Sequence, residues 1–344
     1  MLAARFEGPD DLRIGDFPDP IPGVGEVLVR VGAVGICATD LEVYHGALSY
    51  FTSGMARYPI IPGHEWAGEV VALGEDTRGF AVGDQVTGEC GMGCRACRVC
   101  LEGRYQLCPD RVETGILNRD GAFAELLAFP AVFLHRIDPP LPMVEACLIE
   151  PSAVANHAVH RVGVTPRDTV AVLGAGPIGL LTAQMARIHG AGAVVLLDTR
   201  PHRLALGREL GFSHSLDAAD SGTVSAVRAL TFGGPTVIID ATGNPAALDL
   251  AAALAAPSAR IAAVGVCGGQ RPALDLDSLV TRELSLIGCL GSPHAWPNTI
   301  AMLQDGRLRT KPLVSHVLPL TRLREAFSLI EKQTPGVVKI VVQP

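Results

Sequence analysis

The chain has 344 residues, of which 48% are hydrophobic and 18% charged, so it is long enough to form two domains with substantial cores. Its net charge of −7 argues against a nucleic-acid partner, whose phosphate backbone favours basic proteins. The first twenty residues contain no basic start followed by a long apolar run, so nothing there predicts secretion. We therefore expect a cytoplasmic protein without a membrane partner, with its cysteines reduced.

The first candidate metal ligands lie in two segments, VGAVGICATDLEVYHG and YPIIPGHEWAGEVVALG. Together these segments contain Cys37, Thr39, Asp40, His45, His64 and Glu65. A cysteine and a histidine that the fold brings together can hold Zn²⁺ with a third protein ligand, leaving one position open for a substrate oxygen. A lone histidine before a glycine, such as His45, is more often a surface or capping residue, and a proton relay is the alternative.

A cluster of cysteines follows in GECGMGCRACRVCLEGRYQLC, residues 88–108, which holds five of the nine cysteines. Four of them have the spacing Cys94-x2-Cys97-x2-Cys100-x7-Cys108. Four thiolates on a short loop can surround Zn²⁺ tetrahedrally, and an all-sulfur shell without a vacancy is typical of a structural site. The alternatives are four unrelated thiols or, because three arginines lie nearby, a nucleic-acid zinc module. Cys90 is left over, and a lone extra cysteine is more often a small buried residue than a ligand.

The segment TVAVLGAGPIGLLTAQMARIHGAGAVVLLDTR predicts a dinucleotide site. The glycines of its G-x-G-x-x-G turn, with the two residues between the last pair, are Gly174, Gly176, Pro177, Ile178 and Gly179. The turn follows an apolar strand and opens an Ala/Leu-rich helix, and a second strand ends in Asp198, nineteen residues after the last glycine. In this context the glycines permit the tight turn, the approach to the pyrophosphate and the packing of helix on strand.

Asp198 favours NAD over NADP, because its carboxylate can accept hydrogen bonds from the ribose hydroxyls and would repel a 2′-phosphate. Arg203, and Arg200 beside it, could offset that repulsion or simply form a solvated first turn of the next helix. Further apolar runs punctuated by glycine continue to about residue 290, so we predict a doubly wound parallel sheet. Asn244 and Cys267 follow two of these strands, where nicotinamide contacts could form.

Taken in order, these segments resemble the zinc-containing medium-chain dehydrogenase/reductase family of alcohol and polyol dehydrogenase type, nearest the sorbitol and threonine dehydrogenase branch. The family's G-H-E-x2-G-x5-G signature is matched from Gly63 to Gly74, with a departure only at Thr77, and the likeness spans essentially the whole chain. The resemblance implies two zinc ions per chain, one at the four-cysteine loop and one at Cys37 and His64.

The resemblance also assigns roles at the second site. Asp40 would hold the His64 imidazole from behind, and Glu150, which precedes Pro151 as in the polyol enzymes, would be the third ligand. The alternative is that Glu65 coordinates the metal and Glu150 holds the metal-bound water.

The implied fold is α/β: a Rossmann NAD-binding domain at residues 153–291, inserted into a discontinuous, mainly β, GroES-like catalytic domain at residues 1–152 and 292–344. Family members are commonly dimers or tetramers, so we expect a homodimer or homotetramer.

The implied activity is zinc-dependent hydride transfer between NAD and a small secondary alcohol, such as a polyol, amino alcohol or cyclitol, giving a ketone. Thr39 would pass the alcohol proton on through the cofactor ribose or His45. Residues 290–292 lack the arginine and aromatic side chain found in the sorbitol enzymes, so Glu113, Ser292 and His294 would recognise another substrate. The alternatives are a zinc-free quinone or enoyl reductase of the same plan, or a nucleotide- and zinc-binding protein without turnover.

Overall fold

The computed structural model describes all 344 residues and divides into two compact units. The first comprises Met1–Glu150, Gly291–Gln304 and Val314–Pro344, and the second comprises Pro151–Leu290 and Asp305–Leu313. Residues 305–313 thus group with the second unit, whereas the predicted division kept the whole tail from residue 292 in the first domain. The predicted domain limits stay a prediction.

The first unit consists mainly of strands arranged in three sheets. The largest has seven strands in the order β10-β5-β4-β3-β18-β17, with β9 paired to the first half of β3; β1 pairs with β2, and β6, β7 and β8 form a small sheet. The strands are β1 (Leu2–Gly8), β2 (Asp11–Asp16), β3 (Glu26–Gly35), β4 (Glu65–Leu73), β5 (Gln85–Gly88), β6 (Gly91–Met92), β7 (Val112–Thr114), β8 (Asn118–Arg119), β9 (Leu126–Pro130), β10 (Leu134–Arg136), β17 (Val314–Pro319) and β18 (Lys339–Gln343).

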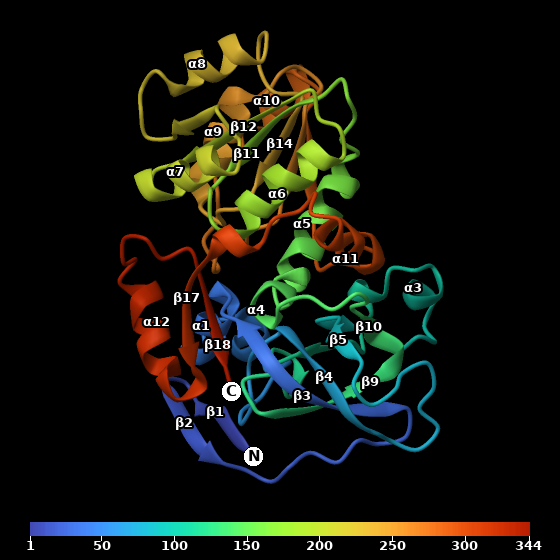
Figure 1. The fold of residues 1–344 in the computed structure, drawn as a ribbon. Coiled ribbons are helices and arrows are strands. Elements are labelled where there is room, and N and C mark those ends of the chain that lie inside the picture. The colour runs from blue at the N-terminus through green and yellow to red at the C-terminus, as the bar shows by residue number, and fades with distance from the viewer. The chain divides into compact units, whose positions relative to one another are not determined.

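The first unit also contains short helices. They are α1 (Ala38–Tyr44), α2 (Ser49–Thr52), α3 (Arg98–Leu101), α4 (Met143–Ala146), α11 (Trp296–Gln304) and α12 (Leu323–Glu331), with 3₁₀ turns at Tyr105–Leu107, Ala131–Phe133 and Leu320–Arg322. Figure 1 shows β3 and β4 as long neighbouring strands, with α12 beside β17. The core holds Phe6, Trp66, Phe129 and Phe327, and the rings of Trp66 and Phe129 meet edge to face at 5.1 Å. This packing fixes the strands that lead into the candidate metal ligands.

The second unit is a six-stranded sheet in which every neighbouring pair is parallel, in the order β13-β12-β11-β14-β15-β16. The strands are β11 (Thr169–Leu173), β12 (Ala193–Asp198), β13 (Ser215–Asp217), β14 (Val237–Asp240), β15 (Arg260–Ala263) and β16 (Ser285–Gly288). Strands β11, β12 and β14 are largely buried, as expected for apolar runs covered on both faces. The predicted doubly wound parallel sheet is confirmed.

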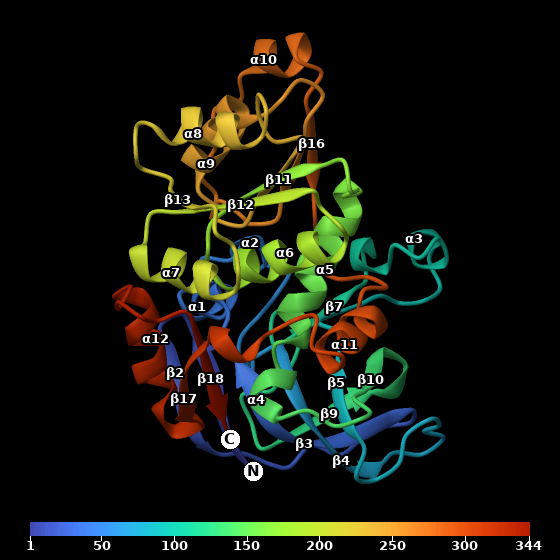
Figure 2. The same ribbon diagram turned by 45° about the horizontal axis from the view of Figure 1, so that its top comes forward.

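Helices lie on both faces of this sheet. They are α5 (Ile149–Val162), α6 (Pro177–Ile188), α7 (Pro201–Glu209), α8 (Thr223–Leu230), α9 (Pro245–Leu254) and α10 (Leu276–Thr281), with a 3₁₀ turn at Lys311–Leu313. Figure 2 shows α8, α9 and α10 on one side of the strands and α5, α6 and α7 on the other. The predicted apolar strand, glycine-rich turn and Ala/Leu-rich helix are thus β11, the turn that follows it, and α6.

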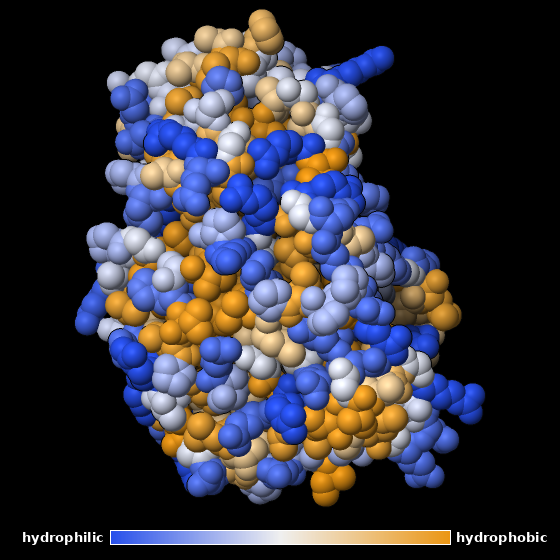
Figure 3. Space-filling view, in the orientation of Figure 1, coloured by the Kyte–Doolittle hydropathy of each residue, from blue (hydrophilic) through white to orange (hydrophobic).

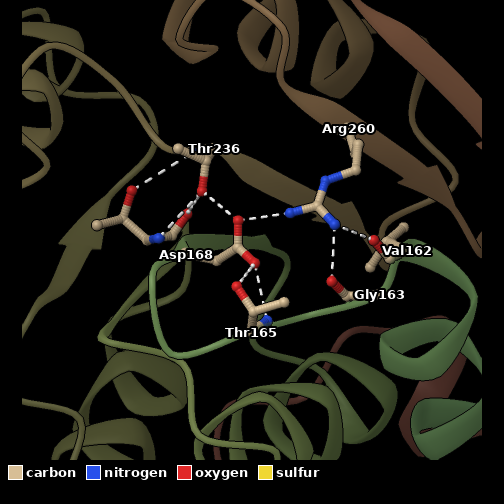
Figure 4. A network of polar contacts seen from close by, with 7 residues as sticks. Val162, Gly163, Thr165, Asp168, Thr236 and Arg260 are labelled. Carbon is tan, nitrogen blue, oxygen red and sulfur yellow. Dashed lines mark hydrogen bonds and ion pairs between the residues drawn. The ribbon is translucent and has the colours of Figure 1, made fainter.

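A network of hydrogen bonds surrounds the buried carboxylate of Asp168, the residue directly before β11 (Figure 4). Asp168 accepts hydrogen bonds from the backbone N–H and the hydroxyl of Thr165, both at 2.8 Å, and from the hydroxyl of Thr236 at 2.8 Å. It also pairs with Arg260, whose guanidinium donates to the Gly163 carbonyl at 2.7 Å. These bonds join the loop after α5 to β14 and β15, at the opposite end of β11 from the glycine-rich turn.

The chain contains no helix that is both long enough and apolar enough to span a membrane. On the face drawn in Figure 3, hydrophilic side chains are interspersed with small hydrophobic patches over each unit.

Candidate metal and nucleotide sites

The pairing of β3 with β4 builds the first candidate metal site. In this antiparallel pair Gly35, near Cys37, lies opposite Glu65, which follows His64 directly. A side chain at position 35 would displace the Glu65 carboxylate, because a Cβ there would collide with it. The Cys37 sulfur, a His64 ring nitrogen and a Glu65 oxygen consequently all lie within 4.8 Å of one another.

Asp40 lies behind the imidazole, where the resemblance places it. Its Oδ2 accepts a hydrogen bond from the Cys37 backbone N–H at 2.8 Å, at the start of α1, and its Oδ1 lies 3.4 Å from Nδ1 of His64. Burial alone would lower the pKa of His64, but Asp40 and Cys37 together hold it well above the usual value. The carboxylate therefore orients the ring and favours charge on it.

A buried lysine, which the sequence analysis missed, completes this site. Lys339 in β18 is only 3% exposed, and its Nζ lies 2.7 and 2.5 Å from the two oxygens of Glu65 and donates to the Ile36 carbonyl at 2.8 Å. Burial alone would lower the pKa of Lys339, but the charges of Glu65 and Cys37 raise it by more, so the net shift of this pKa is upward. The signal in the sequence was a single charge within an otherwise apolar terminal strand, since lysine is almost never buried without a partner.

Glu150, the predicted third ligand, lies outside the converging group. It sits at the start of α5, is 5% exposed, and has its pKa raised to about 7, mainly by burial, with further influence from the charges of His64 and Glu65. The structure thus groups Glu65, not Glu150, with the cysteine and the histidine. The physical reason is strand register: Glu65 is the first residue of β4 and faces Gly35, whereas Glu150 reaches the site from a separate helix.

The two predicted proton-relay residues differ in placement. Thr39 is half-buried, and its hydroxyl lies 3.7 Å from the Cys37 sulfur. His45 ends α1 with both ring nitrogens occupied, by Asp10 at 2.6 Å and by Glu331 at 2.8 Å. Burial lowers the pKa of His45, but the two carboxylates raise it to a net value above normal. A relay through His45 would have to break one of these bonds.

The four cysteines of the second site converge as their spacing predicts. The sulfur atoms of Cys94, Cys97, Cys100 and Cys108 all lie within 4.8 Å of one another, and none of them forms a disulfide. Backbone N–H groups of Ala96 and Cys97 lower the pKa of Cys94 to about 6, because they stabilise the thiolate. Gly93 leaves room for the cluster, since a Cβ there would lie 2.7 Å from the Cys100 sulfur.

Both groups fit zinc by their donor chemistry. A closed shell of four thiolates suits a structural ion, and a sulfur, nitrogen and oxygen set suits a catalytic ion with an open position. Cys90 stands apart from both groups as a half-buried thiol whose pKa is raised mainly by burial.

The glycine-rich turn joins β11 to α6 as predicted. Gly174 has φ +91°, and a Cβ on Gly179 would collide with the Gly174 carbonyl, so both positions require glycine. Pro177 occupies the first turn of α6, followed by Ile178, and Gly176 is its N-cap. The helix N-terminus thereby presents backbone N–H groups to a phosphate.

A cavity of about 420 Å³ opens beside this turn, lined among others by Gly176, Asp198, Arg203 and Asn244. The Asp198 carboxylate accepts hydrogen bonds from the backbone N–H groups of Ala175 at 2.6 Å and Arg200 at 2.8 Å. Arg203 lies 3.8 Å from the same carboxylate. Asn244 caps α9 and lines the cavity, whereas Cys267, which was predicted beside the nicotinamide, is not among its lining residues.

A half-buried thiol that meets a buried imidazole and a buried carboxylate, a four-thiol loop and a dinucleotide-binding parallel sheet together define the class of zinc-containing, nicotinamide-linked dehydrogenases.

Comparisons with known proteins agree with this class. The family described as alcohol dehydrogenase GroES-like domain matches residues 23–139, and the family described as zinc-binding dehydrogenase matches residues 177–305. Sorbitol dehydrogenase of Bacillus subtilis is 32% identical over 346 residues, which cover 100% of this chain and 97% of the relative. The erythritol/L-threitol dehydrogenase of Mycolicibacterium smegmatis is 34% identical, covering 96% and 94%.

Among solved structures, a dehydrogenase from E. coli CFT073, described as a short chain alcohol dehydrogenase complexed with NADH, superposes with a TM-score of 0.91. It is 28% identical and covers 100% of this chain and 99% of its own. The chain belongs to the zinc-containing medium-chain dehydrogenase family of alcohol and polyol dehydrogenase type, and is an oxidoreductase.

Proposed function

We propose that the protein oxidises a secondary hydroxyl group of a small polyol to a ketone, with NAD as the hydride acceptor. The observation that carries this proposal is the convergence of the half-buried Cys37 with the buried His64 and Glu65. The names of its relatives, sorbitol dehydrogenase and erythritol/L-threitol dehydrogenase, support a polyol as the substrate class.

The residues of this site have separate roles in the proposed reaction: metal binding, orientation of a ligand and proton transfer. Cys37, His64 and Glu65 would hold the zinc ion, which when bound supplies a Lewis acid that lowers the pKa of an alcohol. Asp40 keeps the imidazole in place, as a carboxylate behind a ligating histidine commonly does. The Thr39 hydroxyl, near the Cys37 sulfur, is placed to accept and pass on the proton of the alcohol.

The choice between Glu65 and Glu150 rests on the converging geometry. Because Glu65 joins the cysteine and the histidine, we propose it as the third ligand, with Glu150 as the neighbouring carboxylate that orients water or the substrate hydroxyl. This replaces the preference for Glu150 that the resemblance gave.

Matched Glu65→Gln and Glu150→Gln variants test this assignment by zinc content and kcat. Glu65→Gln should weaken zinc binding at this site by at least about 10–100-fold, the loss expected even for residues that only orient ligands. Glu150→Gln should keep its zinc and lose kcat. The reverse pattern would restore Glu150 as the ligand.

Two further features of the proposal concern cofactors. The four-thiol loop would hold a second, structural zinc ion, giving two per chain. We also propose NAD in preference to NADP, because Asp198 places a carboxylate in the nucleotide cavity. Fluorescence titration with NADH and NADPH measures that preference without turnover, and tighter binding of NADPH would show that the neighbouring arginines dominate.

We propose that the protein is a homodimer or homotetramer in the cytoplasm. Strand β16 is the edge strand of the parallel sheet and is largely exposed. Three apolar side chains on or near it are exposed: Leu286 at 43%, Leu290 at 43% and, in α10, Val280 at 69%. An unpaired apolar edge strand is suited to pairing with a second copy. All nine cysteines are free, which accords with a reducing compartment. Light scattering of the wild type and of Leu286→Lys, which should be more dissociated, tests the assembly.

A further inference from the structure

A group of charged and phenolic side chains beside the first metal site has no part in the mechanism above. Glu113 in β7 is 9% exposed, and its Oε1 accepts hydrogen bonds from Nε of Arg111 at 2.7 Å and from the Tyr50 hydroxyl at 3.2 Å. Arg111 also donates to the Tyr50 oxygen at 2.7 Å and to the Cys108 carbonyl at 3.3 Å. The carboxylate is therefore held firmly from one side.

The other carboxylate oxygen keeps its capacity to accept hydrogen bonds. All hydrogen bonds to Glu113 end on Oε1, so Oε2 has no donor within the protein. A carboxylate oxygen accepts about two hydrogen bonds, so Oε2 can bind a donor that a ligand supplies.

The chain around Glu113 packs against the catalytic segment. In the β6–β7 pair Glu113 lies opposite Gly91, and the next residue, Thr114, donates its N–H to the Cys90 carbonyl at 2.9 Å. Gly115 packs so tightly on the backbone before His64 that a Cβ there would lie 2.7 Å from the Gly63 nitrogen.

Cys90 is joined to the Glu113 segment through its backbone, because its carbonyl accepts the Thr114 N–H. Its thiol is half-buried, and its pKa is raised mainly by burial, with smaller influences from the charges of His64, Glu150 and Glu113. Because the segment that follows Glu113 packs on the backbone directly before His64, a substrate whose reacting hydroxyl lies at the metal site could extend to Glu113.

The charge of this group selects among donors. Arg111 compensates the charge of Glu113, so an ammonium group approaching Oε2 would meet a nearby guanidinium, and a phosphate would meet a carboxylate. A neutral hydroxyl group forms a charge-assisted hydrogen bond without either penalty. His294 was also predicted to recognise the substrate, but its Nε2 is already hydrogen-bonded to the Gly103 carbonyl at 2.7 Å.

We propose that Glu113, held by Arg111 and Tyr50, accepts a hydrogen bond from a second hydroxyl group of the substrate and so selects neutral polyols over simple secondary alcohols and amino alcohols. This rests on the proposed dehydrogenase function. Glu113 is thus a specificity-determining residue of that reaction.

The test compares Glu113→Gln with the wild type on three kinds of substrate: four- to six-carbon polyols, 2-butanol, and an amino alcohol such as 1-amino-2-propanol. The variant should lose about 10-fold or more in kcat/KM for the best polyol, mostly through KM, and change by less than about 2-fold for 2-butanol. Glu7→Gln is the matched control, because Glu7 pairs with Arg5 two residues away on β1 just as Glu113 pairs with Arg111. Glu7→Gln should leave kcat/KM unchanged for the polyol and for 2-butanol.

Circular dichroism and zinc content establish that the variants are folded. If Glu113→Gln does not fold, Tyr50→Phe, which removes only one donor to Oε1, should still raise the polyol KM selectively. Equal losses on polyol and 2-butanol would overturn the role of Glu113, and a selective loss on the amino alcohol would overturn the neutral substrate class. A wild type that oxidises none of these substrates with NAD would instead overturn the proposed function.

Discussion

Replacing Lys339 by methionine should destabilise the zinc-free protein far more than the zinc-loaded protein. Lys339 and Glu65 are 3% and 1% exposed, and methionine fills nearly the same volume as lysine, so the change removes a charge from a buried pair without opening a large cavity. Removing one partner of a buried ion pair costs about 3–5 kcal/mol, because the other charge is left uncompensated. In a unit of this size the loss lowers Tm by about 6–20 °C.

Zinc changes this result because a bound cation would neutralise Glu65 in place of the lysine. Thermal unfolding followed by circular dichroism, with a chelator and with added zinc, should show a large loss of Tm only in the chelator. The double variant Lys339→Met/Glu65→Gln should recover most of that loss, since no buried charge remains. A Tm of Lys339→Met within about 2 °C of the wild type in the chelator would show that Lys339 does not compensate the buried charge of Glu65.

Three other predictions follow from single contacts. Cys100→Ser should reduce the zinc content by one ion per chain and lower Tm while sparing turnover at the remaining site; unchanged zinc content by elemental analysis would refute the four-thiol site. His45→Gln should lower Tm near about pH 6 but not near about pH 9, because the pKa of His45 is raised by Asp10 and Glu331 and its contribution is lost as pH rises through that value; a pH-independent difference would contradict this. Asp168→Ala should cost about 2–4 kcal/mol and speed hydrogen exchange in β11 and β14, and unchanged exchange there would show that the network is not structural.

Local sequence patterns were sufficient for the nucleotide unit. The glycine spacing, the apolar run before it and the acidic residue at the end of the next strand predicted β11, α6 and β12, because each of these requirements is met within about thirty residues. The four-cysteine loop was equally predictable, since its ligands come from fifteen consecutive residues.

Contacts between distant segments were not predictable. The group that includes Glu65 depends on the register of β3 against β4, and a shift in that pairing would have turned the side chain away. Lys339 joins the site from the other end of the chain, and His45 is occupied by residues 35 and 286 positions away. In each case the residue type was visible in the sequence, but its partner was set by tertiary packing.

The most direct test of the proposed function compares wild-type protein with Cys37→Ser in zinc content, NADH binding and NADH formation from a panel of polyols. We predict two zinc ions per chain and NAD-dependent oxidation of at least one polyol for the wild type. Cys37→Ser should lose one zinc ion and that turnover while binding NADH as tightly as the wild type. Full turnover by a Cys37→Ser protein that lacks this zinc ion would contradict the account.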